Sequence, residues 1–181
     1  CAQGWDTTDD HLVELAQDLG RTATEGAAAY EAACQKLEEF FAARRPLGRE
    51  ALAELAKDPD RVGIVLFGRP YNAFAEEANM GIPRKFASRG VLIVPFDCLP
   101  FHEEQSTHNM NWAMGQDLTR AAQFVKKHPQ LFGAFVTNFG CGPDSFLVGY
   151  FRDTMKTKPS LTLEIDSHTA DAGINTRVEA F

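Results

Sequence analysis

The feature that most constrains the fold of this chain is a regular alternation of short apolar runs and helical segments after about residue 60. Residues 62–67 form a continuous apolar run of the kind found in strands buried on both faces. Further strands are predicted at residues 91–95, 132–137 and 161–165, with helical patterns between them. Strands and helices that alternate in this way build parallel sheets through βαβ units. We therefore predict a Rossmann-like, three-layer α/β domain with a mostly parallel sheet of four strands, or slightly more.

The first 60 residues differ in character, because they contain no strand-like run and are rich in Ala, Glu, Leu and Gln. We predict that Pro46 ends a long helix there, since proline cannot continue the helical hydrogen-bond ladder. Apolar residues recur in that helix at three- and four-residue steps, which predicts one buried stripe formed by Tyr30, Ala33, Leu37, Phe40 and Phe41. The predicted helices lie at residues 9–19, 26–44 and 49–57. The predicted domains are a helical segment at residues 1–60 and a Rossmann-like half-domain at residues 61–181.

The composition of the chain indicates which classes of binding partner are excluded and which cellular compartment is favoured. The formal charge of −7 argues against nucleic acid and anionic membranes, because both require a positive protein surface. No apolar run approaches the roughly 20 residues needed to span a bilayer. The four cysteines are widely scattered and form no Cys-x-x-Cys pair, which favours a reducing, cytoplasmic setting. Since the chain begins at Cys1 and stops inside a predicted helix, we expect it to be a piece of a longer polypeptide.

The loop after the third predicted strand presents Cys141 as the main candidate for chemistry. In parallel sheets, ligands bind outside the carboxyl ends of the strands, so the post-strand loops should converge on one edge. Gly140 and Gly142 flank the cysteine and allow backbone conformations that other residues resist. Asp144 or Ser145 is suited to cap the helix that follows. A thiol beside a helix N-terminus serves as a metal ligand or as a nucleophile, and the spacing alone does not distinguish these roles.

Other post-strand loops hold further candidates. Arg69 and Asn72 follow the first strand, where the arginine either clamps a carboxylate or phosphate or forms an internal salt bridge that fixes the loop. His168 follows the fourth strand between two aspartates and belongs either to a site or to a structural network within the loop. Cys98 has apolar neighbours and is predicted to be structural, and Asn79 to cap a helix. The histidines after the second strand match no zinc pattern, and no phosphate-loop or dinucleotide fingerprint is present.

Five segments of the chain carry recognisable motifs, at residues 66–72, 79–85, 109–116, 137–146 and 163–173. Together they resemble a known family, the one related to 2-hydroxyacyl-CoA dehydratases and their activators (the DUF2229 type). Its members are described as CoA-substrate-specific enzyme activases or as activators of 2-hydroxyglutaryl-CoA dehydratase. The resemblance covers about residues 61–181, while the helical first third carries no motif that can be placed.

The resemblance implies a Rossmann-like half of a two-domain module, with a 4Fe–4S or related cluster between two such halves. Cys141 is similar to the cysteine ligand contributed by one half, and Gly140, Gly142, Ser145, Arg69, Asn72 and His168 are the cofactor-binding candidates around it. The other ligands would come from a missing half-domain of the same polypeptide. Such clusters support low-potential electron transfer for acyl-CoA dehydration in anaerobic metabolism, so a dehydratase or an electron donor is the implied partner.

Two departures limit what the resemblance implies. No phosphate-binding pattern of an ATPase half is present, so we do not expect this fragment to hydrolyse ATP or to be active alone. Cys98 occupies a position that resembles an aromatic position of the family, so it receives no ligand role. Two alternatives remain open: a module that binds an acyl-CoA or another anion through Arg69 and helix N-termini, and a docking domain without a site of its own.

Overall fold

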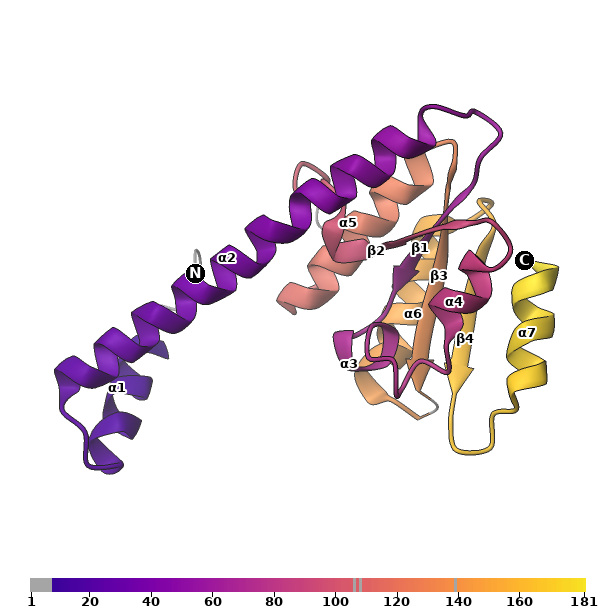
Figure 1. The fold of residues 1–181 in the computed structure, drawn as a ribbon. Coiled ribbons are helices and arrows are strands. Elements are labelled where there is room, and N and C mark those ends of the chain that lie inside the picture. The colour runs from indigo at the N-terminus through magenta and orange to yellow at the C-terminus, as the bar shows by residue number, and fades with distance from the viewer. Residues whose placement is uncertain (1–7, 106, 108, 139) are drawn as a thin grey trace. The chain divides into compact units, whose positions relative to one another are not determined.

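The computed structural model describes residues 8–105, 107, 109–138 and 140–181. Within these residues four strands form one sheet in the order β2-β1-β3-β4, and each neighbouring pair is parallel (Figure 1). The predicted α/β fold with a parallel sheet is confirmed, and each strand lies within one residue of its predicted bounds. The strands are β1 (Gly63–Phe67), β2 (Leu92–Pro95), β3 (Leu131–Asn138) and β4 (Ser160–Ile165).

Helices cover both faces of this sheet and complete the three layers (Figure 1). Helices α5 (Ala113–Lys127) and α6 (Gly142–Met155) pack together on one face, and α4 (Ile82–Ala87) and α7 (Asp171–Ala180) pack together on the other. Successive residues of a strand point to opposite faces, so β3 supplies Phe135 to the first core and Ala134 and Val136 to the second. The continuous apolar runs predicted for buried strands follow from this double covering.

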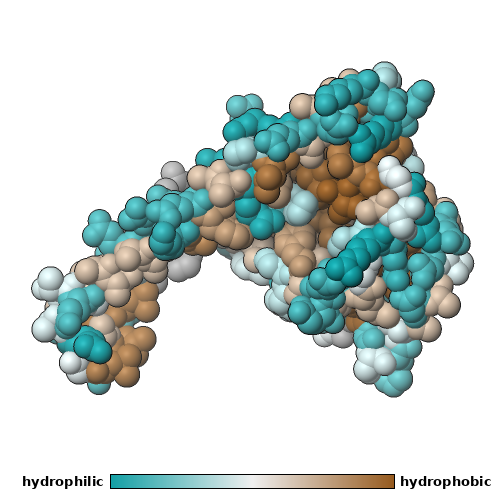
Figure 2. All heavy atoms as spheres, viewed as in Figure 1, coloured by the Kyte–Doolittle hydropathy of each residue, from teal (hydrophilic) through white to brown (hydrophobic). Residues whose placement is uncertain are grey.

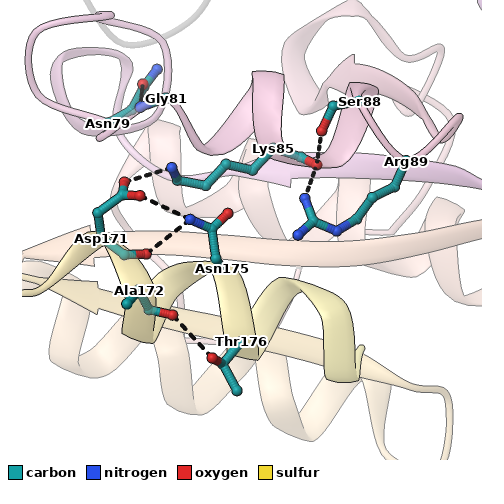
Figure 3. A network of polar contacts seen from close by, with 9 residues as sticks. All are labelled: Asn79, Gly81, Lys85, Ser88, Arg89, Asp171, Ala172, Asn175 and Thr176. Atoms are coloured by element: carbon teal, nitrogen blue, oxygen red, sulfur yellow. Dashed lines mark hydrogen bonds and ion pairs between the residues drawn. The ribbon is translucent and has the colours of Figure 1, made fainter.

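Helices α4 and α7 are also joined by polar contacts at their surfaces (Figure 3). Nζ of Lys85 forms an ion pair with Oδ1 of Asp171 at 2.6 Å, and Nδ2 of Asn175 donates to the other carboxylate oxygen at 2.8 Å. Asp171 is in the first turn of α7, where the helix dipole favours a negative charge. Only the Lys85–Asp171 pair of these two contacts joins α4 to α7, since Asn175 and Asp171 both belong to α7.

The chain divides into two compact units, Cys1–Arg45 and Pro46–Phe181. Helix α2 (Ala23–Leu55) crosses this division as one element, so the prediction that Pro46 ends a helix and that a separate helix follows is wrong. A proline removes one hydrogen bond and kinks a helix, but it does not end a helix held by bonds on both sides. In the second unit, the end of α2 is anchored by Leu55, which is fully buried in the core.

The first unit consists of α1 (Thr8–Asp18) and the start of α2. Thr22 and Glu25 form a capping box at the start of α2, where each side chain accepts a hydrogen bond from the other residue's backbone N–H. The predicted buried stripe is wrong, because Leu37, Phe40 and Phe41 are about half exposed. Their spacing places them on one face, but burial needs a surface to pack against, and the described residues of this unit leave apolar side chains uncovered (Figure 2).

The chain leaves β1 through Gly68 and a single helical turn, α3 (Pro70–Ala73). Gly68 has a φ of +139°, and a Cβ there would lie 2.4 Å from the carbonyl oxygen of Val136, so only glycine permits this close approach to β3. The post-strand loop expected to carry Arg69 and Asn72 therefore contains a turn of helix, which Pro70 at its first position favours. Among the described residues, none of the helices combines the length and apolar character of a membrane span.

Candidate functional site at the carboxyl edge of the sheet

Cys141 lies between the end of β3 and the start of α6, at the sheet edge predicted for a site. Gly140, before it, has a φ of +74°, in the left-handed region that favours glycine. Cys141 is extended and immediately precedes the first helical residue, Gly142, so its thiol lies at the N-terminus of a helix of 14 residues. Its backbone N–H donates to the carbonyl oxygen of Asn138 at 3.1 Å, and its own carbonyl accepts from Ser145 at 3.0 Å. The thiol is therefore held on a fixed backbone and remains partly exposed.

Arg69 reaches this sulfur from the segment that follows the neighbouring strand β1. Its Nη2 donates to Sγ of Cys141, and its Nε forms an ion pair with Oδ1 of Asp144 at 3.0 Å. The carboxylate of Asp144 is only 1% exposed, and its other oxygen accepts a hydrogen bond of 2.6 Å from Oγ1 of Thr137. Since the arginine forms this ion pair, the internal salt bridge expected as one role of Arg69 is present, and it ties the loop after β1 to α6.

Two aromatic rings frame the guanidinium of Arg69. Its Cζ lies 4.9 Å from the ring centroid of Tyr71 and 6.0 Å from that of Trp112, within the range of cation–π interactions. Burial raises the pKa of Tyr71, the positive charge of Arg69 opposes that rise, and the nearby Cys141 adds to it. Both rings are partly exposed, at 51% and 38%, so the sulfur is bordered by aromatic surface as well as by charge.

Asn72 lies one turn after Arg69 and carries an unusual buried amide. Its backbone N–H donates to the carbonyl of Arg69 at 2.9 Å, but its side chain is 1% exposed and neither amide atom has a hydrogen-bond partner among the described residues. Unpaired buried amides are rare in folded proteins because each costs the hydration that it has lost. Asn79, by contrast, is buried with both amide atoms bonded, to the carbonyl of Ala73 and to the N–H of Gly81. The prediction that Asn79 caps α4 is therefore wrong, because Gly81 occupies the N-cap position and Asn79 stabilises the turn before it.

A cavity of about 240 Å³ lies beside the cysteine, between the ends of β3 and β4 and the first turns of α6. Gly140, Cys141 and Ser145 line it together with the charged side chains of Arg152 and Glu164. Oγ of Ser145 donates to the carbonyl of Gly142 at 2.6 Å, so this hydroxyl stabilises the first turn of α6. The cavity leaves the thiol of Cys141 open on one side.

The structure does not bring His168 to this cluster by any described contact. Its ring is 91% exposed, its Nδ1 lies 3.7 Å from Oδ2 of Asp166, and its backbone N–H donates to the same carboxylate. Hydrogen bonds from Thr169 and from the His168 backbone lower the pKa of Asp166. The loop after β4 is thus a local hydrogen-bonded turn, which corresponds to the structural network expected as one role of His168.

The described residues contain no group of three His, Cys, Asp or Glu side chains that could hold a metal ion. Cys98 is 5% exposed within the core cluster, Cys34 lies in α2, and His108 falls outside the described residues. Sequence reasoning missed the pairing of Arg69 with Asp144 and the contribution of Trp112. The available signal was a pair of opposite charges on loops that follow neighbouring parallel strands, which place their carboxyl ends side by side.

Comparison with protein-family models gives one match, to the CoA enzyme activase uncharacterised domain (DUF2229), over residues 2–99. No curated protein and no solved structure matches the chain significantly. The match includes the helical N-terminal third, on which sequence reasoning placed no motif, and it contains Arg69 and Asn72. Cys141 and its loop lie outside the matched residues. Because the match covers more than half of the 181 residues, the chain belongs to the CoA enzyme activase-related family of this domain.

Proposed function

We propose that Cys141 contributes one thiolate ligand to a 4Fe–4S or related cluster, and that the remaining ligands come from a second half-domain of the same polypeptide. The observation that carries this proposal is the position of the sulfur, fixed at the N-terminus of α6, open on one side and contacted by the guanidinium of Arg69. Iron–sulfur clusters are held by cysteine thiolates that converge from several loops. One cysteine side chain, that of Cys141, lies at this edge.

The residues around Cys141 fit one side of a cluster site. A metal-bound thiolate is negatively charged, and Arg69 and the N–H groups at the start of α6 compensate such a charge. Gly140 and Gly142 carry no side chains that would obstruct a bulky group beside the sulfur, and nothing lies within 4 Å of where a Cβ would stand on either. A complete ligand set is not present in the described residues, so the proposal requires ligands from outside them.

The cluster would supply one-electron transfer at low potential. The residues of this chain would hold its ligand sulfur, exclude bulk water on the side of the buried Asp144 and offer the partly exposed rings of Tyr71 and Trp112 to an adjoining domain. With the family shown to be CoA enzyme activase-related, we propose that the whole protein serves electron transfer to an acyl-CoA dehydratase. The alternative, anion binding through Arg69, is less favoured because its guanidinium is already paired with a buried carboxylate.

The test is anaerobic reconstitution of the full-length parent protein, followed by iron and sulfide counting and electron paramagnetic resonance. Cys141→Ala should abolish or strongly reduce the cluster. Cys34→Ala is the matched control, because Cys34 is also a free, partly buried cysteine but lies in α2 of the first unit. If the Cys141→Ala protein holds as much cluster as the wild type, the proposal is refuted.

A further inference from the structure

The two edge strands of the sheet, β2 and β4, differ in how far they are protected against pairing with another chain (Figure 1). At β4, Nη2 of Arg177 donates to the carbonyl oxygen of Thr162 at 2.6 Å, so a side chain already occupies part of the strand backbone. Glu164 adds an exposed charge within the same strand. Charges and side-chain cover of this kind keep edge strands from pairing with other chains. Among the described residues, no side-chain hydrogen bond reaches the backbone of β2.

The backbone of Ile93 faces the open side of β2. The N–H of Leu92 donates to the carbonyl oxygen of Val62 at 3.2 Å, which turns the peptide groups of Leu92 and Val94 toward β1. Because alternate residues of a parallel strand bond to opposite sides, the N–H and C=O of Ile93 point away from β1. β1 is the only neighbour of β2 in the sheet that the described residues form. This edge therefore offers an unpaired donor and acceptor to a further strand.

The side chains beside this open backbone are apolar and only partly buried. Leu92 packs against one core and Val91 and Ile93 against the other, yet all three remain partly exposed. The same three residues line a cavity of about 430 Å³, together with Pro83 and Ala87 of α4. An apolar edge with free backbone groups is suited to an added strand, whose backbone takes the hydrogen bonds and whose side chains cover the apolar surface.

We propose that β2 pairs with β2 of a second copy of this chain, antiparallel across a two-fold axis. A two-fold interface uses the same surface twice, so the edge has to be complementary to itself. With Ile93 at the axis, the two copies exchange both hydrogen bonds of that residue, and the N–H of Val91 donates to the carbonyl of Pro95 in the other copy. Pro95 has no N–H, so only the reverse bond at the strand end is missing. This inference does not involve Cys141 and is independent of the proposed function.

The charges at the two ends of β2 favour this orientation. In the antiparallel register, Asp97 of the second copy lies opposite Arg89, beside the cavity that Arg61 and Arg84 line. Each of these arginines pairs with a carboxylate of its own chain that is at least 44% exposed, and exposed ion pairs contribute little to stability. The basic end of the strand therefore still attracts an acidic one. A parallel arrangement would instead place like charges together, so complementarity selects the antiparallel copy.

The experiment measures self-association of the full chain by analytical ultracentrifugation from about 1 μM to about 1 mM. We expect the wild type to form dimers, and Ile93→Pro to raise the dissociation constant at least about tenfold, the scale of two lost backbone hydrogen bonds. Proline is tolerated on an edge strand where the N–H faces outward, so the pairing of β2 with β1 is kept. Phe41→Gln is the control, because it removes an apolar side chain, 42% exposed, from α2 in the first unit and should leave the dissociation constant unchanged.

Exchanging the two charges tests the orientation separately. Asp97→Lys and Arg89→Glu should each weaken the dimer, and the double variant should restore it, because opposite charges then face each other again. A chain that stays monomeric over the whole range, or an unchanged dissociation constant in Ile93→Pro, would overturn the proposal. A dimer weakened by Phe41→Gln alone would also overturn it, by placing the contact on α2. Should Ile93→Pro fail to fold, the charge exchange decides, and additive weakening in the double variant refutes the antiparallel pairing.

Discussion

The unpaired amide of Asn72 leads to the most specific prediction about stability. We expect Asn72→Leu to stabilise the second unit, although it replaces a polar residue next to the candidate site. The side chain is 1% exposed, and neither its oxygen nor its nitrogen has a hydrogen-bond partner among the described residues. A leucine of similar shape removes the cost of the unpaired buried amide and adds apolar contact in the same space.

The expected change in the free energy of unfolding follows from the missing hydrogen bonds of the Asn72 amide. An unsatisfied buried polar group costs about 1–3 kcal/mol of stability, which the substitution recovers. The strain of accommodating the slightly larger leucine offsets part of this stabilisation. We therefore expect the free energy of unfolding to rise by about 1–2 kcal/mol, or about 2–4 °C in melting temperature for each kcal/mol in a chain of this size. Asn79→Leu is the matched control. It should lower stability by about 1–3 kcal/mol, because its buried amide bonds Ala73 and Gly81.

Urea unfolding followed by tryptophan fluorescence measures both variants. The chain has two tryptophans, so a Trp5→Phe background leaves Trp112, at the candidate site, as the reporter of the second unit. The reasoning is refuted if Asn72→Leu destabilises the protein by as much as Asn79→Leu does. That result would mean that the amide of Asn72 is satisfied in solution.

Two further predictions concern packing and pH. Gly48→Ala should cost several kcal/mol in urea unfolding, because its Cβ would stand 1.8 Å from the carbonyl oxygen of Cys98. Gly149→Ala in α6 places its Cβ in open space and should raise the free energy of unfolding by about 0.5–1 kcal/mol. Equal effects of the two substitutions would contradict the close contact of Gly48 with Cys98. Burial and the charge of Lys158 lower the pKa of His128 below 6.5. The unfolded chain therefore binds this proton first, so stability should fall as pH drops below about 6.5, and His128→Gln should flatten that dependence below about pH 6.5.

The strands of the second unit could be predicted closely because their signal is local. A run such as residues 62–67, apolar throughout, has few alternatives to a strand covered on both faces, and the parallel order then follows from the intervening helices. Helix α2 shows the limit of such reasoning. Pro46 lowers helix propensity locally, but the helical residues on both sides of it keep α2 continuous. A rule about proline alone does not include the helix propensity of these neighbouring residues.

The candidate site was predictable in position and less so in its contacts. The spacing around Cys141 placed a thiol on a post-strand loop, and the parallel sheet brought Arg69 to the same edge. His168 lies at that edge too, yet its contacts stay within its own loop, since strand order does not determine where an exposed side chain is directed. The burial of Asp144, which forms an ion pair with Arg69, depends on packing between α6 and β3 and has no local sequence signal.

The central claim is that Cys141 is a cluster ligand, and iron content tests it most directly. The measurement is iron bound per chain in the full-length protein after anaerobic reconstitution and removal of loose metal, compared between wild type, Cys141→Ala and Cys34→Ala. The account predicts that Cys141→Ala loses most of the iron while Cys34→Ala matches wild type. Equal iron in all three proteins, or none in the wild type, would contradict it.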